Sequence, residues 1–259
     1  MTAEISSTSH GATMVLTIRN PEHRNALAPE IYPAGIEALS VAETVPEVRS
    51  VVITGEGRDF CAGGQLQRLL AASQGGLEHQ SAQVQGLHDW VEAIRTFPKP
   101  VIMAVEGAAA GGGMSLALAG DFLVAADNAV FVMAHVNIGL SCDGGGAWSL
   151  ARTLPRQVVS EIALAGERIT ARRLHELGIV NRVVTPGTAL SEALTLADRL
   201  NARAPNALAS IKELLNEASG RTLAEHLGAE REHLIRNLAH PNGRIGIQAF
   251  LDRATPHYE

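Results

Sequence analysis

Two glycine-rich loops are the first places in this sequence where chemistry could be carried out. Residues 61–64 (CAGG) and 110–114 (AGGGM) each come after an apolar run, and glycine lets backbone N–H groups approach a ligand closely. The second loop leads into helical spacing, so its free amides would point outward at a helix N-terminus. Two such amides directed at one point form an oxyanion hole, which stabilises a developing negative charge. For either loop taken alone, tight turns and close packing are the simpler interpretation.

Other kinds of site find little support in the residue pattern. Neither loop contains the G-x-G-x-x-G or G-x-x-x-x-G-K-[ST] motif, so we expect no phosphate cradle. The two cysteines, Cys61 and Cys142, have neither the spacing of metal ligands nor that of a disulfide framework. We therefore expect no metal site and two reduced cysteines, as is usual in cytosolic proteins.

Composition and charge narrow the class of protein further. The chain has 259 residues, of which 46% are hydrophobic and 19% are charged, as in globular domains. Its net charge of −6 and its 3% of aromatic residues argue against nucleic acid or an anionic membrane as the main partner. Residues 1–11 lack the pattern of a signal peptide, and no apolar run reaches the length of a membrane span. We expect a soluble, cytoplasmic protein.

Short strands in the first half of the chain position the two loops. Apolar or alternating runs predict five of them, at residues 14–19, 51–54, 101–105, 123–126 and 129–133. The second of these strands leads into the first glycine-rich loop, and the third strand leads into the second loop. Both loops are thus expected at the ends of buried strands.

Helices connect the strands and dominate the second half. Helical spacing predicts helices at residues 29–44 and 80–96, and helical patterns prevail beyond about residue 145. This order implies an α/β core followed by helices. We divide the chain into a core at residues 1–189, which carries the site, and a helical region at residues 190–259. The helical region has more apolar residues than one flanking layer needs, so we expect it to be buried against a partner.

Four segments of the sequence together form a recognisable pattern. They are residues 18–27 (IRNPEHRNAL), 59–66 (DFCAGGQL), 99–107 (KPVIMAVEG) and 110–113 (AGGG). In this order and spacing they resemble the crotonase (enoyl-CoA hydratase/isomerase) superfamily, and the resemblance covers nearly the whole chain. It implies a crotonase-like spiral of ββα units with a C-terminal helical trimerisation region, in a homotrimer or homohexamer.

The resemblance also implies an acyl-coenzyme A site. The thioester oxygen would lie between the amides of Gly64 and Gly112, which agrees with the oxyanion hole inferred from the loops. Coenzyme A would be part of the substrate, with no other cofactor. The residues that match the substrate-binding positions are Arg24, Ala26, Ala62, Gly64, Gln65, Leu66 and Gly112.

The acid and base residues depart from the hydratase pattern. Hydratases of this superfamily carry glutamates at the positions that match Ser115 and His135, so the addition of water by two glutamates is not available here. We interpret Ser115 as a helix-start residue with a satisfied hydroxyl. His135 could be a catalytic imidazole, because histidine titrates near neutral pH, or a structural histidine that lines the pocket.

A carboxylate, Asp143, follows these two positions in the sequence. Taken alone, an aspartate before a helical pattern is often an N-cap. However, residues 131–148 closely resemble the ring-epoxide isomerase branch of phenylacetate degradation, in which an aspartate at this position moves protons. We therefore expect an acyl-CoA isomerase with Asp143 as its base. The alternatives are an enoyl-CoA hydratase, an aryl-CoA dehalogenase that uses Asp143 with His88, and a catalytically silent acyl-CoA-binding relative.

Overall fold

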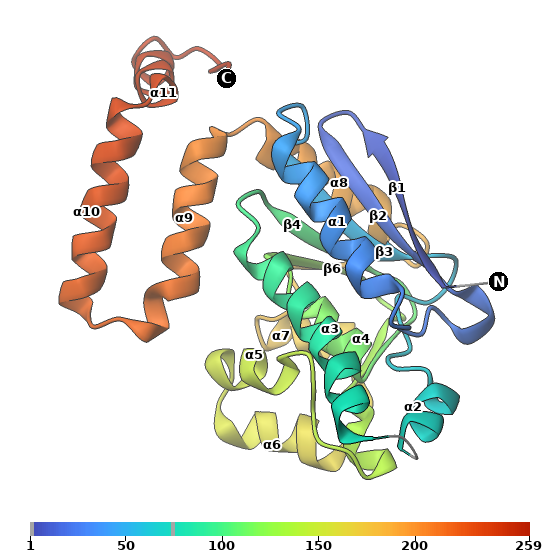
Figure 1. Cartoon of the computed structure of the whole chain (residues 1–259). Coiled ribbons are helices and arrows are strands. Elements are labelled where there is room, and N and C mark those ends of the chain that lie inside the picture. Colours follow the sequence, from blue (N-terminus) through green and yellow to red (C-terminus); the bar gives the residue numbers. More distant parts are fainter. Residues whose placement is uncertain (1–2, 74–75) are drawn as a thin grey trace.

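A six-stranded sheet forms the centre of the computed structural model, which describes residues 3–73 and 76–259 (Figure 1). Its strands, in spatial order, are β1 (Glu4–His10), β2 (Thr13–Arg19), β3 (Ser50–Gly55), β4 (Val101–Val105), β6 (Phe122–Ala126) and β9 (Arg182–Val184). β1 runs antiparallel to β2, and every other neighbouring pair is parallel. The loops that follow β3 and β4 therefore leave the sheet at the same edge.

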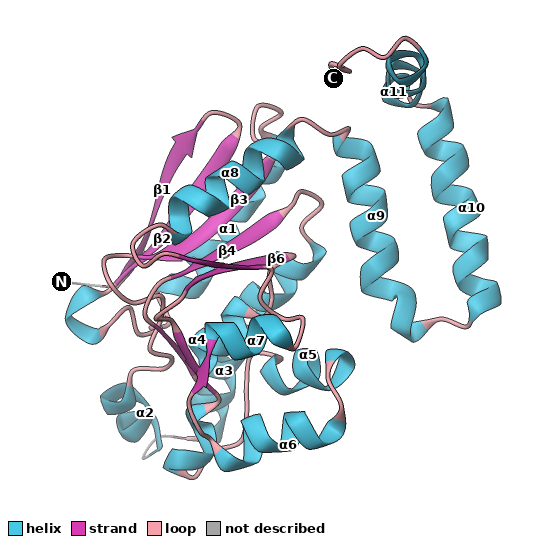
Figure 2. Cartoon of the chain, turned by 180° about the vertical axis from the view of Figure 1, so that it is seen from behind, coloured by secondary structure: helices cyan, strands magenta, loops and turns pink. Residues whose placement is uncertain are grey.

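Helices cover both faces of this sheet because successive strand residues point to opposite sides. On one face, Ile53 and Met103 pack with α1 (Ile31–Thr44) and α3 (Leu77–Thr96) in the larger core cluster. On the other face, Val52 and Ile102 pack with α8 (Ala189–Asn201), which crosses the sheet in the reverse view of Figure 2. The strands are thus buried on both sides.

A second sheet of three short strands lies beside the first. It consists of β5 (Ala108–Ala110), β7 (Val130–Val132) and β8 (Ile169–Thr170). β5 begins only three residues after β4 ends, so the chain passes almost directly from the large sheet to the small one. The turn is made at Gly107, whose φ of +53° favours glycine. The remaining core helices are α2 (Leu66–Ser73), α4 (Gly112–Ala117), α5 (Gly146–Thr153), α6 (Arg156–Ala165) and α7 (Ala171–Glu176).

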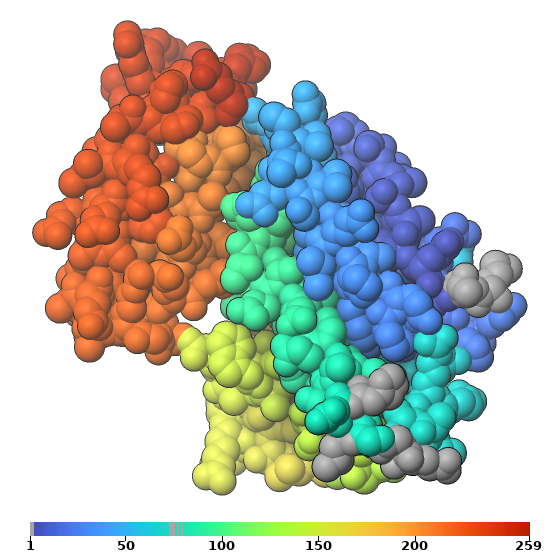
Figure 3. Space-filling model, viewed as in Figure 1, coloured from blue at the N-terminus to red at the C-terminus, as the bar shows by residue number. Residues whose placement is uncertain are grey.

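The last helices form an arm that stands to one side of the sheets. The arm consists of α9 (Pro205–Glu217), α10 (Leu223–Ala239) and α11 (Pro241–Leu251), coloured orange to red in Figure 3. Many of its large apolar side chains are exposed, and Phe250 has an exposed fraction of 85%. No helix in the described ranges is long and apolar enough to cross a membrane.

Lys212 of α9 fastens this arm to the core. Its Nζ donates to Oδ2 of Asp121 at 2.7 Å and to the backbone carbonyls of Ile94 and Lys99, each at 3.3 Å. The same Asp121 oxygen accepts from the Val101 amide at 2.8 Å. Burial raises the pKa of Asp121 and lowers that of Lys212, so each charge depends on the other to remain ionised.

The five predicted strands and both predicted helices are confirmed, with shifted ends. The helix expected at 29–44 begins at Ile31, and the one expected at 80–96 begins at Leu77. The strands that were not predicted are β1, β5, β8 and β9. The division into a core and a helical region at residues 189/190 stays a prediction. α8 packs on the sheet, and the helices that project from the core begin with α9.

Replacing Lys212 by methionine should destabilise the protein. The variant leaves the Asp121 carboxylate among largely buried surroundings without its cation, which typically costs about 3–5 kcal/mol. Urea unfolding would measure the loss. Arg231→Met, on the exposed surface of α10, is the control and should change the free energy of unfolding by less than about 0.5 kcal/mol. Equal effects of the two substitutions would contradict the role given to Lys212.

Candidate active site

The two glycine-rich loops predicted to carry the chemistry lie against each other. The Cys61 amide donates to the Ala108 carbonyl at 2.9 Å, and the Ala110 amide donates back to the Cys61 carbonyl at 2.9 Å. The first loop is thereby joined to β5, the strand that leads into the second loop. Residues separated by almost fifty positions in the chain are fixed at hydrogen-bond distance.

Glycine is required where these loops meet. A Cβ on Gly63, whose φ is +86°, would lie 2.5 Å from the Ala110 carbonyl oxygen. One on Gly113 would lie 2.3 Å from the Cys61 carbonyl oxygen. Both distances are shorter than any ordinary contact between carbon and oxygen. Close packing, the simpler interpretation of the glycines, is therefore correct for these two positions.

The neighbouring glycines, Gly64 and Gly112, present free amides. In the part of the chain that the structure describes, neither backbone N–H donates a hydrogen bond. Gly112 is the first residue of α4, where no preceding turn supplies an acceptor. Buried Leu27 and Leu87 flank it: a Cβ on Gly112 would lie 3.4 Å and 3.3 Å from their methyl groups. Both predicted oxyanion donors are thus available, in largely apolar surroundings.

Asp143 lies next to Gly112, as expected for a base that works beside the oxyanion hole. Its Oδ1 would be 3.5 Å from a Cβ on Gly112. The same oxygen is 2.9 Å from Nε2 of His135, which is buried in a short 3₁₀ segment, Ala134–Ile138. The residue that precedes α5 is Gly145, and no side chain makes a capping hydrogen bond there. The N-cap interpretation of Asp143 is therefore wrong.

Ser115 is also in contact with Asp143. Its hydroxyl donates to the Asp143 backbone carbonyl at 2.8 Å, so the prediction of a satisfied hydroxyl is confirmed. The side chain is 1% exposed and lies against two glycines of the next loop. A Cβ on Gly144 or Gly146 would come within 2.9 Å of it. The Ser115 side chain is therefore closely packed against the loop that carries Asp143.

The residues predicted to bind coenzyme A occupy two adjacent segments. The Ala62 amide donates to the Arg24 carbonyl at 3.0 Å, and the Leu27 amide donates to the Gly63 carbonyl at 2.7 Å. Ala26 is buried in this ladder. Gln65 is half-buried beyond it, and Leu66 opens α2 with an exposed fraction of 55%. The structure thus brings Arg24, Ala26, Ala62, Gly64, Gln65 and Leu66 together, and Gly112 lies on the neighbouring α4.

The Arg24 side chain makes a bidentate ion pair rather than standing free. Its Nε and one terminal nitrogen donate to the two carboxylate oxygens of Asp59 at 2.8 and 2.9 Å. Oδ1 of Asp59 also accepts from the Ala108 amide at 3.0 Å, which connects the pair to β5. The hydrogen bond from Arg24 lowers the pKa of Asp59. The sequence pattern did not reveal this partner of Arg24.

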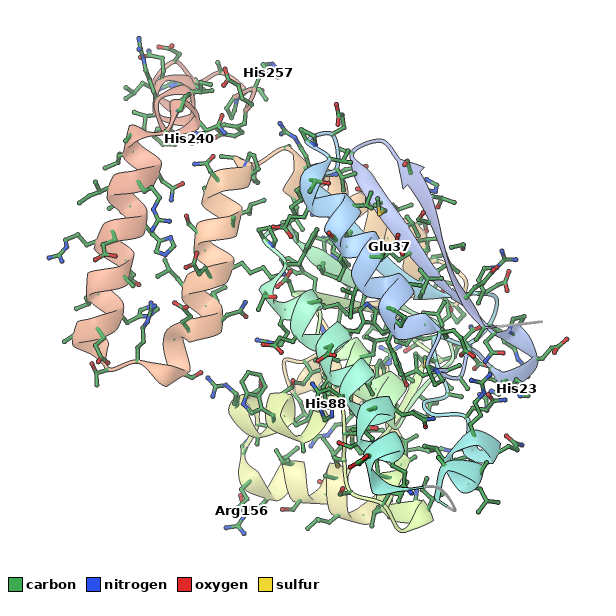
Figure 4. The ribbon with its side chains drawn as sticks, in the orientation of Figure 1. His23, Glu37, His88, Arg156, His240 and His257 are labelled. Carbon is green, nitrogen blue, oxygen red and sulfur yellow. The ribbon has the colours of Figure 1, made fainter. Side chains whose placement is uncertain are left out.

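Several other candidates lie outside this constellation. His88 is exposed on α3, where Figure 4 labels it, and the structure brings His135 rather than His88 to Asp143. Cys61 and Cys142 are both free, and burial raises the pKa of Cys61 to about 12. The described residues contain no group of three or more side chains that could hold a metal ion.

Two cavities are separate from the site. One, of about 410 Å³, lies where α9 meets the core and is lined by Arg95, Trp148 and Arg152 among others. The other, of about 270 Å³, lies between α1 and α3 beside Tyr32. Neither is lined by Asp143, so neither measures the size of the substrate.

Comparison with known proteins decides the family. The model of the enoyl-CoA hydratase/isomerase family matches residues 8–259 of this chain. The chain belongs to this family. The expected fold, that of the crotonase superfamily, is therefore confirmed for nearly its whole length.

Members of the family with different activities are similar to this chain. The 1,2-epoxyphenylacetyl-CoA isomerase of Escherichia coli K12 is 35% identical over 246 residues, which cover 95% of this chain and 94% of that protein. The 2,3-dehydroadipyl-CoA hydratase of the same strain is 32% identical, with 95% and 94% covered. An enoyl-CoA hydratase from Polaromonas sp. JS666, known from a crystal structure, is 64% identical in sequence. The two structures match with a TM-score of 0.98, over 99% of this chain and 100% of that chain. The family thus includes both isomerases and hydratases.

Replacing Asp59 by asparagine should weaken the enoyl-CoA hydratase/isomerase core in a pH-dependent way. Losing the charge-assisted bonds to Arg24 costs about 2 kcal/mol at pH 7. Because the folded-state pKa of Asp59 is lowered, this stabilisation is complete above the unfolded value of about 3.9 and is lost as pH falls toward the folded value. Urea unfolding at several pH values should show the difference between wild type and variant shrinking below about pH 4.

The control for this experiment is Asp127→Asn, which removes the exposed ion pair between Asp127 and Arg172. Exposed pairs contribute little, so its effect should be much smaller than that of Asp59→Asn at pH 7 and should change little with pH. An Asp59→Asn variant as stable as this control at pH 7 would contradict the structural role of the Arg24–Asp59 pair.

Proposed function

We propose that this protein is an acyl-CoA isomerase in which Asp143 carries a proton between two carbons of the acyl group. The observation that supports this most directly is the position of the Asp143 carboxylate beside the free amide of Gly112. Ser115 and His135 supply no carboxylate at the positions where the resemblance expects two glutamates. A single base that removes and returns one proton suits an isomerisation better than the addition of water.

The reaction begins with the thioester oxygen accepting hydrogen bonds from Gly64 and Gly112. Asp143 then removes a proton from a carbon near the thioester, and the electron pair of that C–H bond moves into an enolate. The two amides stabilise the negative charge on its oxygen, each by about 3 kcal/mol in comparable sites. The protonated Asp143 returns the proton to a carbon farther along the enolate, which shifts the double bond.

Asp143 has one oxygen available for this transfer. Oδ1 is engaged with His135, whereas Oδ2 makes no hydrogen bond within the described residues. Only a proton is moved in the proposed reaction, so no redox cofactor is needed and coenzyme A enters as part of the substrate. The activity named for the E. coli relative makes 1,2-epoxyphenylacetyl-CoA the first probe, with trans-3-hexenoyl-CoA as an aliphatic probe.

Hydration is the second candidate, because several relatives are named hydratases, including the Polaromonas protein. The addition of water requires a base that takes a proton from the water and an acid that delivers a proton to the neighbouring carbon. Among the described residues Asp143 is the carboxylate that lies beside Gly112, and the residues at positions 115 and 135 are a serine and a histidine. Rapid hydration of crotonyl-CoA by the unmodified protein would favour this candidate over isomerisation.

We also propose that the arm mediates assembly into a homotrimer or a dimer of trimers. Exposed apolar side chains on all three arm helices support this, since such surfaces are usually buried against a partner. The most exposed of them are Leu215, Leu223, Leu234, Phe250 and Leu251. Sedimentation at micromolar concentration should give three or six copies, and Phe250→Glu should shift the population toward smaller species. A stable monomeric wild type would contradict the proposal.

Two substitutions at Gly112 should distinguish the effect of losing its N–H donor from the effect of adding a Cβ. Gly112→Ala adds a Cβ that meets only flexible side-chain atoms at 3.3–3.5 Å and keeps the N–H donor. Gly112→Pro adds the same Cβ but removes the donor, in a first-turn helix position that tolerates proline. We expect the proline variant to lose about 10²–10³-fold in kcat on the two probes, and the alanine variant to lose far less. Equal losses would contradict an oxyanion role for this amide.

Asp143→Asn should abolish most of the activity without disturbing the fold. The asparagine can still place an oxygen near His135, but it cannot accept the proton from substrate. Turnover should therefore fall by about 10²–10⁴-fold, while acyl-CoA affinity and melting temperature stay near those of the wild type. Asp89→Asn, an exposed change on α3, is the matched control and should keep full activity. An Asp143→Asn variant with unchanged turnover would overturn the proposed function.

A further inference from the structure

We infer that His135 and Ser115 are positioning residues for Asp143, the imidazole holding its carboxylate and the hydroxyl holding its backbone. This inference rests on the proposed function, because it assumes that Asp143 moves the proton. Both side chains are buried, and their contacts reach Asp143 from two different elements. In the proposed reaction neither side chain itself transfers a proton.

The imidazole fixes which oxygen of Asp143 is free. A carboxylate that acts as a base only accepts hydrogen bonds, so the proposed function makes Nε2 of His135 the donor to Oδ1 of Asp143, 2.9 Å away. His135 is 7% exposed, and its other ring nitrogen, Nδ1, is buried without a partner among the described residues. The bond to Asp143 is thus the sole described polar contact of this ring. It leaves Oδ2 as the acceptor that can face a substrate.

The peptide around His135 is itself anchored. Its carbonyl accepts from the Leu140 amide at 2.9 Å, and the side-chain amide of Asn137 donates to the Gly166 carbonyl at 2.8 Å. Gly166 follows α6, so this bond joins the 3₁₀ segment to the end of a regular helix. The imidazole is therefore presented to Asp143 from a supported segment.

The hydroxyl connects the base to the oxyanion hole. Ser115 is the fourth residue of α4, and Gly112, a proposed oxyanion donor, is the first residue of the same helix. The bond from the Ser115 hydroxyl to the Asp143 carbonyl, at 2.8 Å, ties the loop that carries the base to that helix. The spacing between base and oxyanion donor is thereby set through one short helix and one hydrogen bond.

The loop that carries Asp143 needs such support. Between the 3₁₀ segment and α5 it contains three glycines with positive φ, Gly139, Gly144 and Gly145, and it forms no regular secondary structure. Glycine-rich irregular backbone has many accessible conformations. A displacement of a catalytic group by about 1 Å can reduce the rate by about 100-fold. The two side-chain contacts supply the restraint that the loop backbone lacks.

The test compares variants that keep or remove the donor at position 135. His135→Gln keeps a side-chain N–H that can reach Asp143 but cannot titrate, whereas His135→Leu removes the donor. On 1,2-epoxyphenylacetyl-CoA and trans-3-hexenoyl-CoA we expect His135→Leu to lose about 10- to 100-fold in kcat with KM within about threefold of the wild type. We expect His135→Gln to stay within about threefold. A glutamine variant as inactive as the leucine variant would overturn the inference and make His135 a proton carrier.

Ser115→Ala tests the second contact independently of position 135. It should lower kcat by about tenfold at little cost in KM, because it releases the loop and touches no substrate. Thr54→Val is its control, since the buried Thr54 hydroxyl makes an equivalent bond to the Ala104 carbonyl at 2.9 Å away from the site. The control should keep full kcat with a similar loss of melting temperature. Equal kcat for both variants and the wild type would contradict a positioning role for Ser115.

Asp143→Asn in the same assays distinguishes a failure of the proposed function from a failure of the positioning inference. If it remains fully active, the proposed function itself fails. If it is inactive while His135→Leu and Ser115→Ala keep full kcat, the proposed function stands and the positioning inference fails. Should His135→Leu not fold, His135→Asn replaces it, because its shorter amide cannot reach the carboxylate; this variant is then expected to show the same loss of kcat.

Discussion

The site depends on the contact between the Cys61 loop and β5. The reciprocal hydrogen bonds between Cys61, Ala108 and Ala110 join the loop after β3 to the strand that precedes α4. Without them the amides of Gly64 and Gly112 would lie on two independent loops, and neither glycine-rich segment would define a point in space. The glycines at positions 63 and 113 permit this approach because any side chain there would overlap a carbonyl oxygen of the opposite loop.

The parallel order of β2, β3, β4 and β6 makes that contact possible. Parallel strands send their following loops to the same edge of the sheet, so the segments after β2, β3 and β4 converge there. Arg24 belongs to the first of these segments and Asp59 to the second, and Asp59 also binds the Ala108 amide of the third. One buried carboxylate thus holds all three segments together beside the proposed site.

The sequence alone predicts the buried strands and both glycine-rich loops because their patterns are local. It misses β1, whose residues are mostly polar and exposed, since this edge strand is held by its seven-residue pairing with β2 rather than by an apolar face. It also misses the bond between His135 and Asp143. Those residues are eight positions apart across an irregular loop, and no helical or strand periodicity brings them together.

The surroundings of Asp143 are a second feature that local sequence patterns do not predict. An aspartate shortly before a helical pattern suggests a cap, but the loop turns at Gly144 and Gly145, and the carboxylate faces His135 instead. The sequence does not show that two successive glycines adopt positive φ, and this conformation sets the direction in which the loop turns. Resemblance to a family, rather than spacing, led to the expectation that Asp143 lies near Gly112, where the structure places it.

A crystal structure with a bound acyl-CoA that resists turnover, such as phenylacetyl-CoA, tests the central claim most directly. The account predicts that the thioester oxygen lies about 2.7–3.1 Å from the backbone nitrogens of both Gly64 and Gly112, with the Asp143 carboxylate facing the acyl carbons. A thioester bound away from these two amides, or an Asp143 carboxylate turned from the acyl group, would contradict it.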